Sequence, residues 1–107
     1  MNPETNTIYV TNVTGGSVSV ISGRTNAVTA TILVGSAPRA VGLNPKTNSI
    51  YVANQFDNTV SVISGRTNTV TATVPVGSFP MGVAVNPNTS TIYVANVNGD
   101  SVSSPST

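Results

Sequence analysis

Few residues in this chain of 107 residues are able to carry acid–base or metal chemistry. The sequence contains no His, Cys or Trp, and its carboxylates are Glu4, Asp57 and Asp100. Without an imidazole or a thiol, a Ser-His-Asp triad, a Cys nucleophile and the usual zinc ligand sets are excluded. We therefore predict no catalytic residues, no metal site and no cofactor.

Asp57 and Asp100 fall in corresponding loops of a repeated sequence, which raises the question of a carboxylate pair or a Ca²⁺ site. The two are one position out of register, however, because Asp57 aligns with Gly99 rather than with Asp100. Asp, Asn and Gly are all favoured in turns. We interpret both aspartates as turn formers.

The repeat has a period of 42 residues, with Asn2, Asn44 and Asn86 at equivalent positions. About 26 of the 42 positions are identical between residues 2–43 and residues 44–85, and a partial third repeat covers 86–107. This period lies within the range of propeller blades and of some helical repeats. We treat residues 1–107 as a single repeat array.

Each repeat is predicted to form four short strands, because its apolar residues alternate or run in short blocks rich in Val, Ile, Thr and Tyr. Asn, Pro and Gly bound these blocks. The first strand is expected at 39–43 and 81–85, the second at 7–11, 49–53 and 91–95, the third at 17–21, 59–63 and from Ser101, and the last at 27–33 and 69–74.

Turn residues separate the predicted strands. Asn-Pro at 44–45 and 86–87 is typical of a turn between the first and second strands of a repeat. Gly23 and Gly65 lie between the third and last strands, where they would supply a positive φ if the turn requires one.

The polarity of the strands changes in a graded way. The first strand carries small residues on one face, such as Gly82 and Ala84, and the second is apolar on both faces. The last strand alternates strictly, as in Val70, Thr71 and Ala72, which indicates one wet face. This order matches the crowded inner, sandwiched middle and exposed outer strands of a β-propeller blade. A β-solenoid is the alternative, although it does not explain the gradient.

The segment Tyr9–Val10–Thr11–Asn12 reads YVTN, and the pattern NPxTNxIYVxN…NTVSVIxGxTNxVTATxxVGxxP resembles the YVTN-type β-propeller repeat as far as about Val102. The resemblance implies four-stranded antiparallel blades, usually seven in a closed ring. It also implies a secreted or surface-layer protein of bacteria or archaea. The chain departs from the pattern in its size and at Ser104-Pro105, which replace the Val-Ile of the third strand.

The predicted fold is therefore all-β, a β-propeller fragment of about two and a half four-stranded antiparallel blades. The strands would leave the first blade without its inner strand and the last without its outer one. Propellers typically close with 4–8 blades. We expect either a longer natural protein or a homo-oligomer that closes the ring by strand exchange.

Positions that differ between repeats are candidates for binding, because scaffold positions must satisfy the same packing in every blade. The differences cluster in two kinds of loop that should project from the same end of the fold, where binding residues often lie. They are Val13/Gln55/Val97, Thr14/Phe56/Asn98, Ala37/Phe79 and Arg39/Met81. From these sets we select Arg39, Phe56, Phe79 and Met81 as contact residues.

The repeated Arg24 and Arg66 are interpreted as structural, and Tyr9, Tyr51 and Tyr93 as core packing between blades. The net charge is +1 and only 7% of residues are charged, so no basic patch suggests nucleic acid. No apolar run is long enough to insert into a membrane.

The predicted function is non-enzymatic: a repeat module at a cell surface or outside the cell that binds a protein, a glycan or its own copies. Two alternatives remain open. The chain could belong to a larger propeller enzyme or ligand-binding protein with active residues in other blades, or it could be a tiling element of a surface layer.

Overall fold

The computed structural model describes residues 5–96 and 101–103, and within these residues it contains ten β-strands and no helix. Accordingly, no helix in the described part could cross a membrane. The strands are β1 (Thr7–Asn12), β2 (Ser17–Ser22), β3 (Ala27–Leu33), β4 (Pro38–Asn44), β5 (Ser49–Asn54), β6 (Thr59–Ser64), β7 (Thr69–Pro75), β8 (Pro80–Asn86), β9 (Thr91–Asn96) and β10 (Ser101–Ser103).

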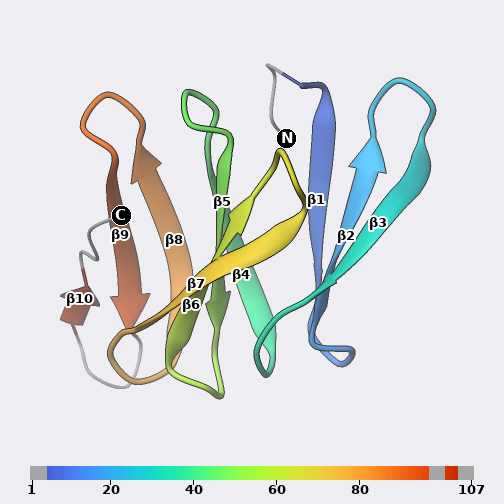
Figure 1. Cartoon of the computed structure of the whole chain (residues 1–107). Helices are drawn as coiled ribbons and strands as arrows, with labels where there is room; N and C mark the ends of the chain where they lie inside the picture. Colours follow the sequence, from blue (N-terminus) through green and yellow to red (C-terminus); the bar gives the residue numbers. More distant parts are fainter. Residues whose placement is uncertain (1–4, 97–100, 104–107) are drawn as a thin grey trace.

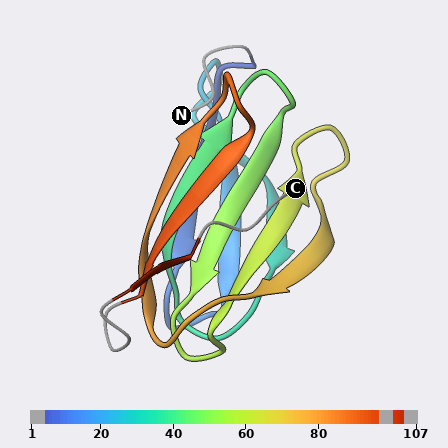
Figure 2. The same ribbon diagram turned by 90° about the vertical axis from the view of Figure 1, so that its left-hand side faces the viewer.

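The strands form three antiparallel sheets in chain order: a first sheet β1-β2-β3, a middle sheet β4-β5-β6-β7 and a third sheet β8-β9-β10. The sheets stand side by side and are joined by short loops (Figures 1 and 2). This arrangement confirms the predicted all-β fold and the four strands of the complete repeat. Pro75 ends β7, the outermost strand of the middle sheet, where one backbone donor can be spared.

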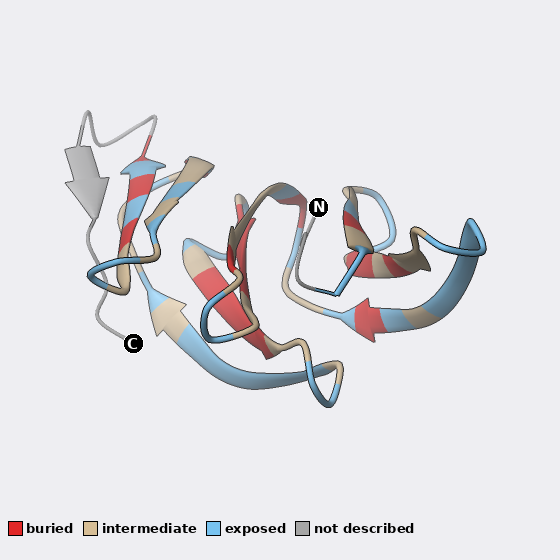
Figure 3. Ribbon diagram, turned by 90° about the horizontal axis from the view of Figure 1, so that it is seen from above, coloured by how far each residue is buried: buried red, intermediate tan, exposed pale blue. Residues whose placement is uncertain are grey.

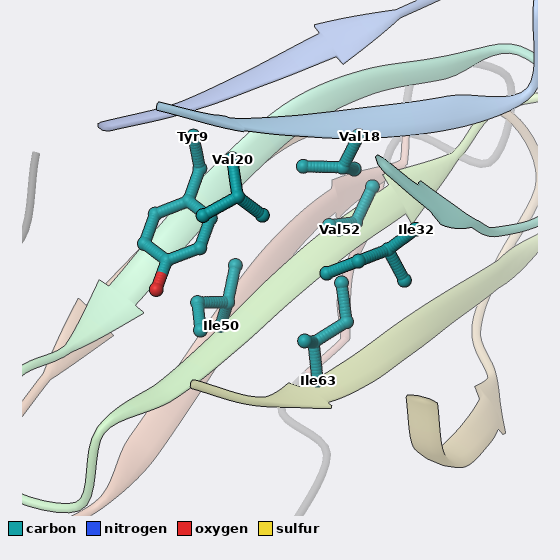
Figure 4. Packing of buried hydrophobic residues seen from close by; sticks show 7 residues of the cluster. All are labelled: Tyr9, Val18, Val20, Ile32, Ile50, Val52 and Ile63. Atoms are coloured by element: carbon teal, nitrogen blue, oxygen red, sulfur yellow. The ribbon is translucent and has the colours of Figure 1, made fainter. Parts of the chain in front are cut away.

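Two hydrophobic clusters hold the sheets together. The first lies between the first and middle sheets and includes Tyr9, Val18, Ile50 and Val52 (Figure 4). The second lies between the middle and third sheets, where Tyr51 packs with residues such as Ile92 and Val94. Each sheet therefore packs against the next, and strands β5 and β6 of the middle sheet are buried on both faces.

The innermost strands of neighbouring sheets approach closely at Gly42. A Cβ atom at this position would lie 2.7 Å from Val83 Cγ1 and 3.0 Å from Val85 Cγ2. Distances this short leave no room for a methyl group beside two valines. The small residue in β4 therefore allows β8 to pack against it.

The turns between the third and last strands differ from the prediction for their glycines. The positive φ falls on Asn26 (58°) and Asn68 (56°), and neither Gly23 nor Gly65 has a positive φ. Asn tolerates this conformation better than most residues. The glycines are needed for close approach instead, because a Cβ atom at Gly65 would lie 2.7 Å from Asn48 Cγ and one at Gly23 would lie 2.8 Å from Asn6 O.

The last strand of each repeat is more exposed than its strict alternation predicted. In Figure 3, most of β3 and β7 is coloured as exposed, and Val70 and Ala72 of the apolar row are among the exposed residues. A register shift lies between Val62 and Ile63, opposite this row. The apolar row is buried only near the end of the strand, where Ile32 of β3 joins the core.

The prediction for the repeated tyrosines is confirmed at two positions and wrong at the third. Tyr9 and Tyr51 are buried between sheets, whereas Tyr93 is 46% exposed. The physical reason is that a following sheet covers the first two rings, and none of the described residues covers the third.

Candidate functional site

The loops predicted to share one end of the fold do so. The β1–β2, β3–β4, β5–β6 and β7–β8 loops all lie at the lower end in Figure 1. Backbone hydrogen bonds join two of them directly, since Gln55 N donates to Ala37 O at 3.0 Å and Phe56 N donates to Ser36 O at 3.3 Å. The varying positions of the β3–β4 and β5–β6 loops are therefore brought together in space, whereas Val97 and Asn98 lie outside the described residues.

Side chains of the β5–β6 loop hold both neighbouring loops in place. Ser36 N donates to Asp57 Oδ2 at 2.8 Å on the β3–β4 side, and Phe79 N donates to Asn58 Oδ1 at 3.0 Å on the β7–β8 side. Asp57 thus acts as the turn residue that the sequence predicted. Glu4 and Asp100 lie outside the described residues.

The buried Asn54, at the end of β5, anchors the same loop. Its Oδ1 accepts from Gly35 N at 3.2 Å, and its Nδ2 donates to Thr59 Oγ1 at 3.2 Å and to Ser61 Oγ at 2.9 Å. These bonds link the end of β5 to β6 and to the preceding loop. The loops at this end are consequently held by a polar network.

Phe56 and Phe79 meet on this support. Their ring centroids lie 5.9 Å apart with planes tilted by 54°, within the usual range for an attractive aromatic pair. Phe56 is 62% exposed and Phe79 is half-buried. Two of the four predicted contact residues thus form one aromatic surface.

Arg39 forms a second pair beside the first. Its Nε donates to Gln55 Oε1 at 2.7 Å, and both side chains reach solvent. Gln55 directly precedes Phe56, so each pair has one member in the β5–β6 loop. Met81 occupies on β8 the repeat position that Arg39 occupies on β4, and its side chain is exposed. We call these five residues, Arg39, Gln55, Phe56, Phe79 and Met81, the loop face.

Gln55 was missed as a site residue, although its variation between repeats was visible. Val13 and Val97 stand at its position in the other repeats. The replacement of a valine by a polar glutamine in this loop could have identified Gln55 as a contact residue. Its bond to Arg39 could not be predicted from the sequence alone.

The loop face consists of one cation, one amide and three large apolar side chains. Within the described ranges, no three His, Cys, Asp or Glu residues lie close enough together to hold a metal ion. Burial raises the pKa of Tyr9 above its ordinary value of 10.0, but this ring packs in the core away from the loops. A groove of about 460 Å³ between the first and middle sheets is lined by residues such as Leu33, Asp57 and Thr59. The Asp57 carboxylate in that groove already accepts the bond from Ser36.

The chain matches no protein-family model and no curated protein. Among solved structures, it is similar to hydrazine synthase of Kuenenia stuttgartiensis, with 31% identity and a TM-score of 0.86 over 90% of this chain and 27% of that one. A dihydro-heme d1 dehydrogenase, NirN, gives 20% identity and a TM-score of 0.76 over 90% of this chain and 21% of that one.

A third similar structure is the β-propeller domain of Cps50 (Swd1) from Myceliophteria thermophila. It shares 14% identity and a TM-score of 0.75 over 88% of this chain and 30% of that one. The chain thus spans no more than about a third of any of these three proteins. Together with the stacked antiparallel sheets, the comparisons show that the three sheets are blades of a β-propeller fold.

Proposed function

We propose that the chain is a non-enzymatic β-propeller module that binds a protein partner through the loop face. The observation that carries the proposal is the exposed Phe56–Phe79 pair on loops fixed by hydrogen bonds. Phe56 is 62% exposed, so most of its ring surface gains nothing from folding. Aromatic side chains, Met and Arg are also the residues most enriched at protein interfaces.

The backbone at Phe79 supports a role beyond packing. Its φ is 53°, a left-handed conformation that costs an ordinary L-residue about 1–2 kcal/mol. The preceding repeat has the same conformation at Ala37, with φ 54°. A bulky ring at this position is therefore not needed to build the loop. The phenyl ring of Phe79 is thus an addition to a turn that the repeat also builds with Ala37.

Arg39 and Gln55 supply the polar part of the proposed interface. Their bond ties the guanidinium to the loop that carries Phe56, while the remaining N–H groups of Arg39 can donate to a partner. Arg and large aromatic residues often dominate binding energy when they lie at the centre of an interface. A protein surface with a small apolar knob and an acceptor group would complement this arrangement.

We place the protein outside the cell or on its surface. The low proportion of charged residues, the abundance of Thr, Ser and Asn, and the resemblance of Tyr9–Asn12 and its repeat to the YVTN family support this assignment. Fractionation of the source organism, with detection of the native protein, tests it. Recovery in the cytoplasmic fraction alone would contradict the assignment.

The binding role is tested by capture from a surface-protein extract of the source organism. The informative variant is F56T/F79A, because the first repeat carries Thr14 and Ala37 at these positions and folds in the same way. The matched control is L33S, which removes a side chain that is 76% exposed on β3. Proteins retained by wild type and L33S but lost with F56T/F79A are expected. Identical retained sets for all three would overturn the proposal.

A second candidate function is membership of a larger propeller enzyme. The 31% identity to the hydrazine synthase structure favours it. The present chain spans 27% of that protein's chain. Turnover assays on the full-length gene product decide between the candidates. The binding module should show no activity that depends on residues of further blades.

A further inference from the structure

Repeat positions that are packed between sheets in the middle sheet lie on an outward face in the first or the third sheet. We call the outward face of the third sheet the forward flank, formed by Gly82, Ala84, Tyr93 and Ala95. We call the outward face of the first sheet the rear flank, formed by Ile8, Val10 and Ile21. The equivalent positions of the middle sheet lie inside one of the two hydrophobic interfaces.

The forward flank is apolar and open. Tyr93 is 46% exposed, whereas Tyr51 at the same repeat position is 2% exposed under Ile92 and Val94. Ala95 is likewise exposed, and its equivalent Ala53 is fully buried. A shallow hollow of about 320 Å³ lies over this flank and is lined almost entirely by apolar atoms.

The rear flank is the counterpart. Val10 is 42% exposed, and its equivalent Val52 is completely buried. In the middle sheet, Ile50 and Val52 cover Tyr9 of the sheet before it (Figure 4). Within the chain, residues at the rear-flank positions of one sheet therefore cover the tyrosine at the forward-flank position of the preceding sheet.

We infer that the forward flank of one copy packs on the rear flank of a second copy of this chain. In this contact Tyr93 would lie against Ile8 and Val10 of the second copy, as Tyr51 lies against Ile92 and Val94 within the chain. The chain already forms this kind of interface twice, and the rear flank repeats its second-strand and third-strand positions. The first sheet has no strand equivalent to β8, which adds Val83 and Val85 to the interface over Tyr51. Neither flank carries a charged residue that would oppose the contact.

Such a contact is head to tail, and head-to-tail contacts form rings when the rotation between subunits closes. Each copy supplies three sheets. Two copies therefore supply six, which lies within the 4–8 blades typical of propellers, whereas three copies supply nine. We expect a closed pair in which the sheets stack face to face. This stacking needs no exchange of strands between chains.

Cross-linking tests the direction of the contact, because the chain has no cysteine of its own. The variants are V10C on the rear flank and A95C on the forward flank, treated with a short bis-maleimide. A cross-linked dimer is expected when the two variants are mixed and not when either is alone. A dimer from A95C alone would show a symmetric contact and would overturn the inference.

Light scattering tests the stoichiometry. The wild-type chain should have about twice the monomer mass of 10.8 kDa, and Y93R should lose the dimer while keeping its circular dichroism spectrum. The matched control R66A removes an exposed side chain of the β6–β7 loop and should remain a dimer. A single-chain mass for wild type, a ladder beyond the dimer, or a dimer of Y93R would each overturn the two-copy ring.

Discussion

Phe56 and Phe79 come from different loops, yet their ring centroids lie 5.9 Å apart at the end of the middle sheet. Asp57 and Asn58 accept hydrogen bonds from Ser36 N and Phe79 N, and these bonds hold the loops on either side. The fold therefore presents an aromatic surface on a fixed support. Binding sites are often built in this way, with variable loops on a rigid scaffold.

The two rings should stabilise each other. In a double-mutant cycle of F56A, F79A and the double variant, we expect a coupling energy of about 0.5–1 kcal/mol, in line with aromatic pairs that are partly exposed. Urea unfolding followed by circular dichroism measures it. Strictly additive losses of stability would show that the rings do not interact in solution.

Asn54 should contribute more to stability than its repeat equivalent Asn12. N54A removes three hydrogen bonds at a fully buried position, and we expect a loss of about 2–3 kcal/mol in the free energy of unfolding. Asn12 is half-buried and bonds to Ser17 and Ser19, so N12A should cost about 1 kcal/mol. Equal losses in chemical denaturation would contradict the role assigned to the buried network.

The close approach of β4 and β8 should make Gly42 sensitive to a methyl group. G42A forces Val83 and Val85 apart, and overpacking of this kind costs about 1–3 kcal/mol. The matched control is G82A, where the added Cβ would lie 3.7 Å from Ala95 Cβ, an ordinary contact. Thermal unfolding at the lowest usable concentration should show a loss for G42A alone; a normal midpoint for G42A would refute tight packing here.

Stability should fall in strongly alkaline solution partly because of Tyr9. Burial raises the pKa of Tyr9 above its ordinary value of 10.0, so the folded chain holds the phenol proton more tightly than the unfolded chain. Titration of Tyr9 therefore does not change the free energy of unfolding below about pH 10, and it lowers this free energy as the pH rises through the raised pKa.

Comparing Y9F with wild type isolates this contribution. Urea unfolding between pH 9 and 11 should show a shallower fall of stability with rising pH in Y9F than in wild type. Parallel curves for Y9F and wild type would argue against the burial of this ring.

The strands and their stacking could be predicted because the same hydrophobic pattern occurs in successive repeats. Alternation of Val and Ile with polar residues places β2, β5 and β6 within one residue of their observed bounds. The positive φ at Asn68 could not be assigned with the same certainty, because Gly65 in the same turn is equally permissive. Exposure of Tyr93 depends on a neighbouring sheet rather than on its own repeat.

The loop face was predicted in part. Variation between repeats identified Phe56 and Phe79, and antiparallel topology placed their loops at one end. The ring contact and the Arg39–Gln55 bond depend on side-chain directions across separate loops. Sequence spacing does not determine such directions, so the pairing emerged only from the structure.

The central claim is that the paired rings of Phe56 and Phe79 bind a protein partner. Isothermal titration of a captured partner against wild type, L33S and F56T/F79A tests it most directly. Losing the aromatic pair should cost about 2 kcal/mol or more of binding free energy in total, which weakens F56T/F79A at least about 30-fold, with L33S unchanged. Equal affinity of F56T/F79A and wild type would contradict the claim.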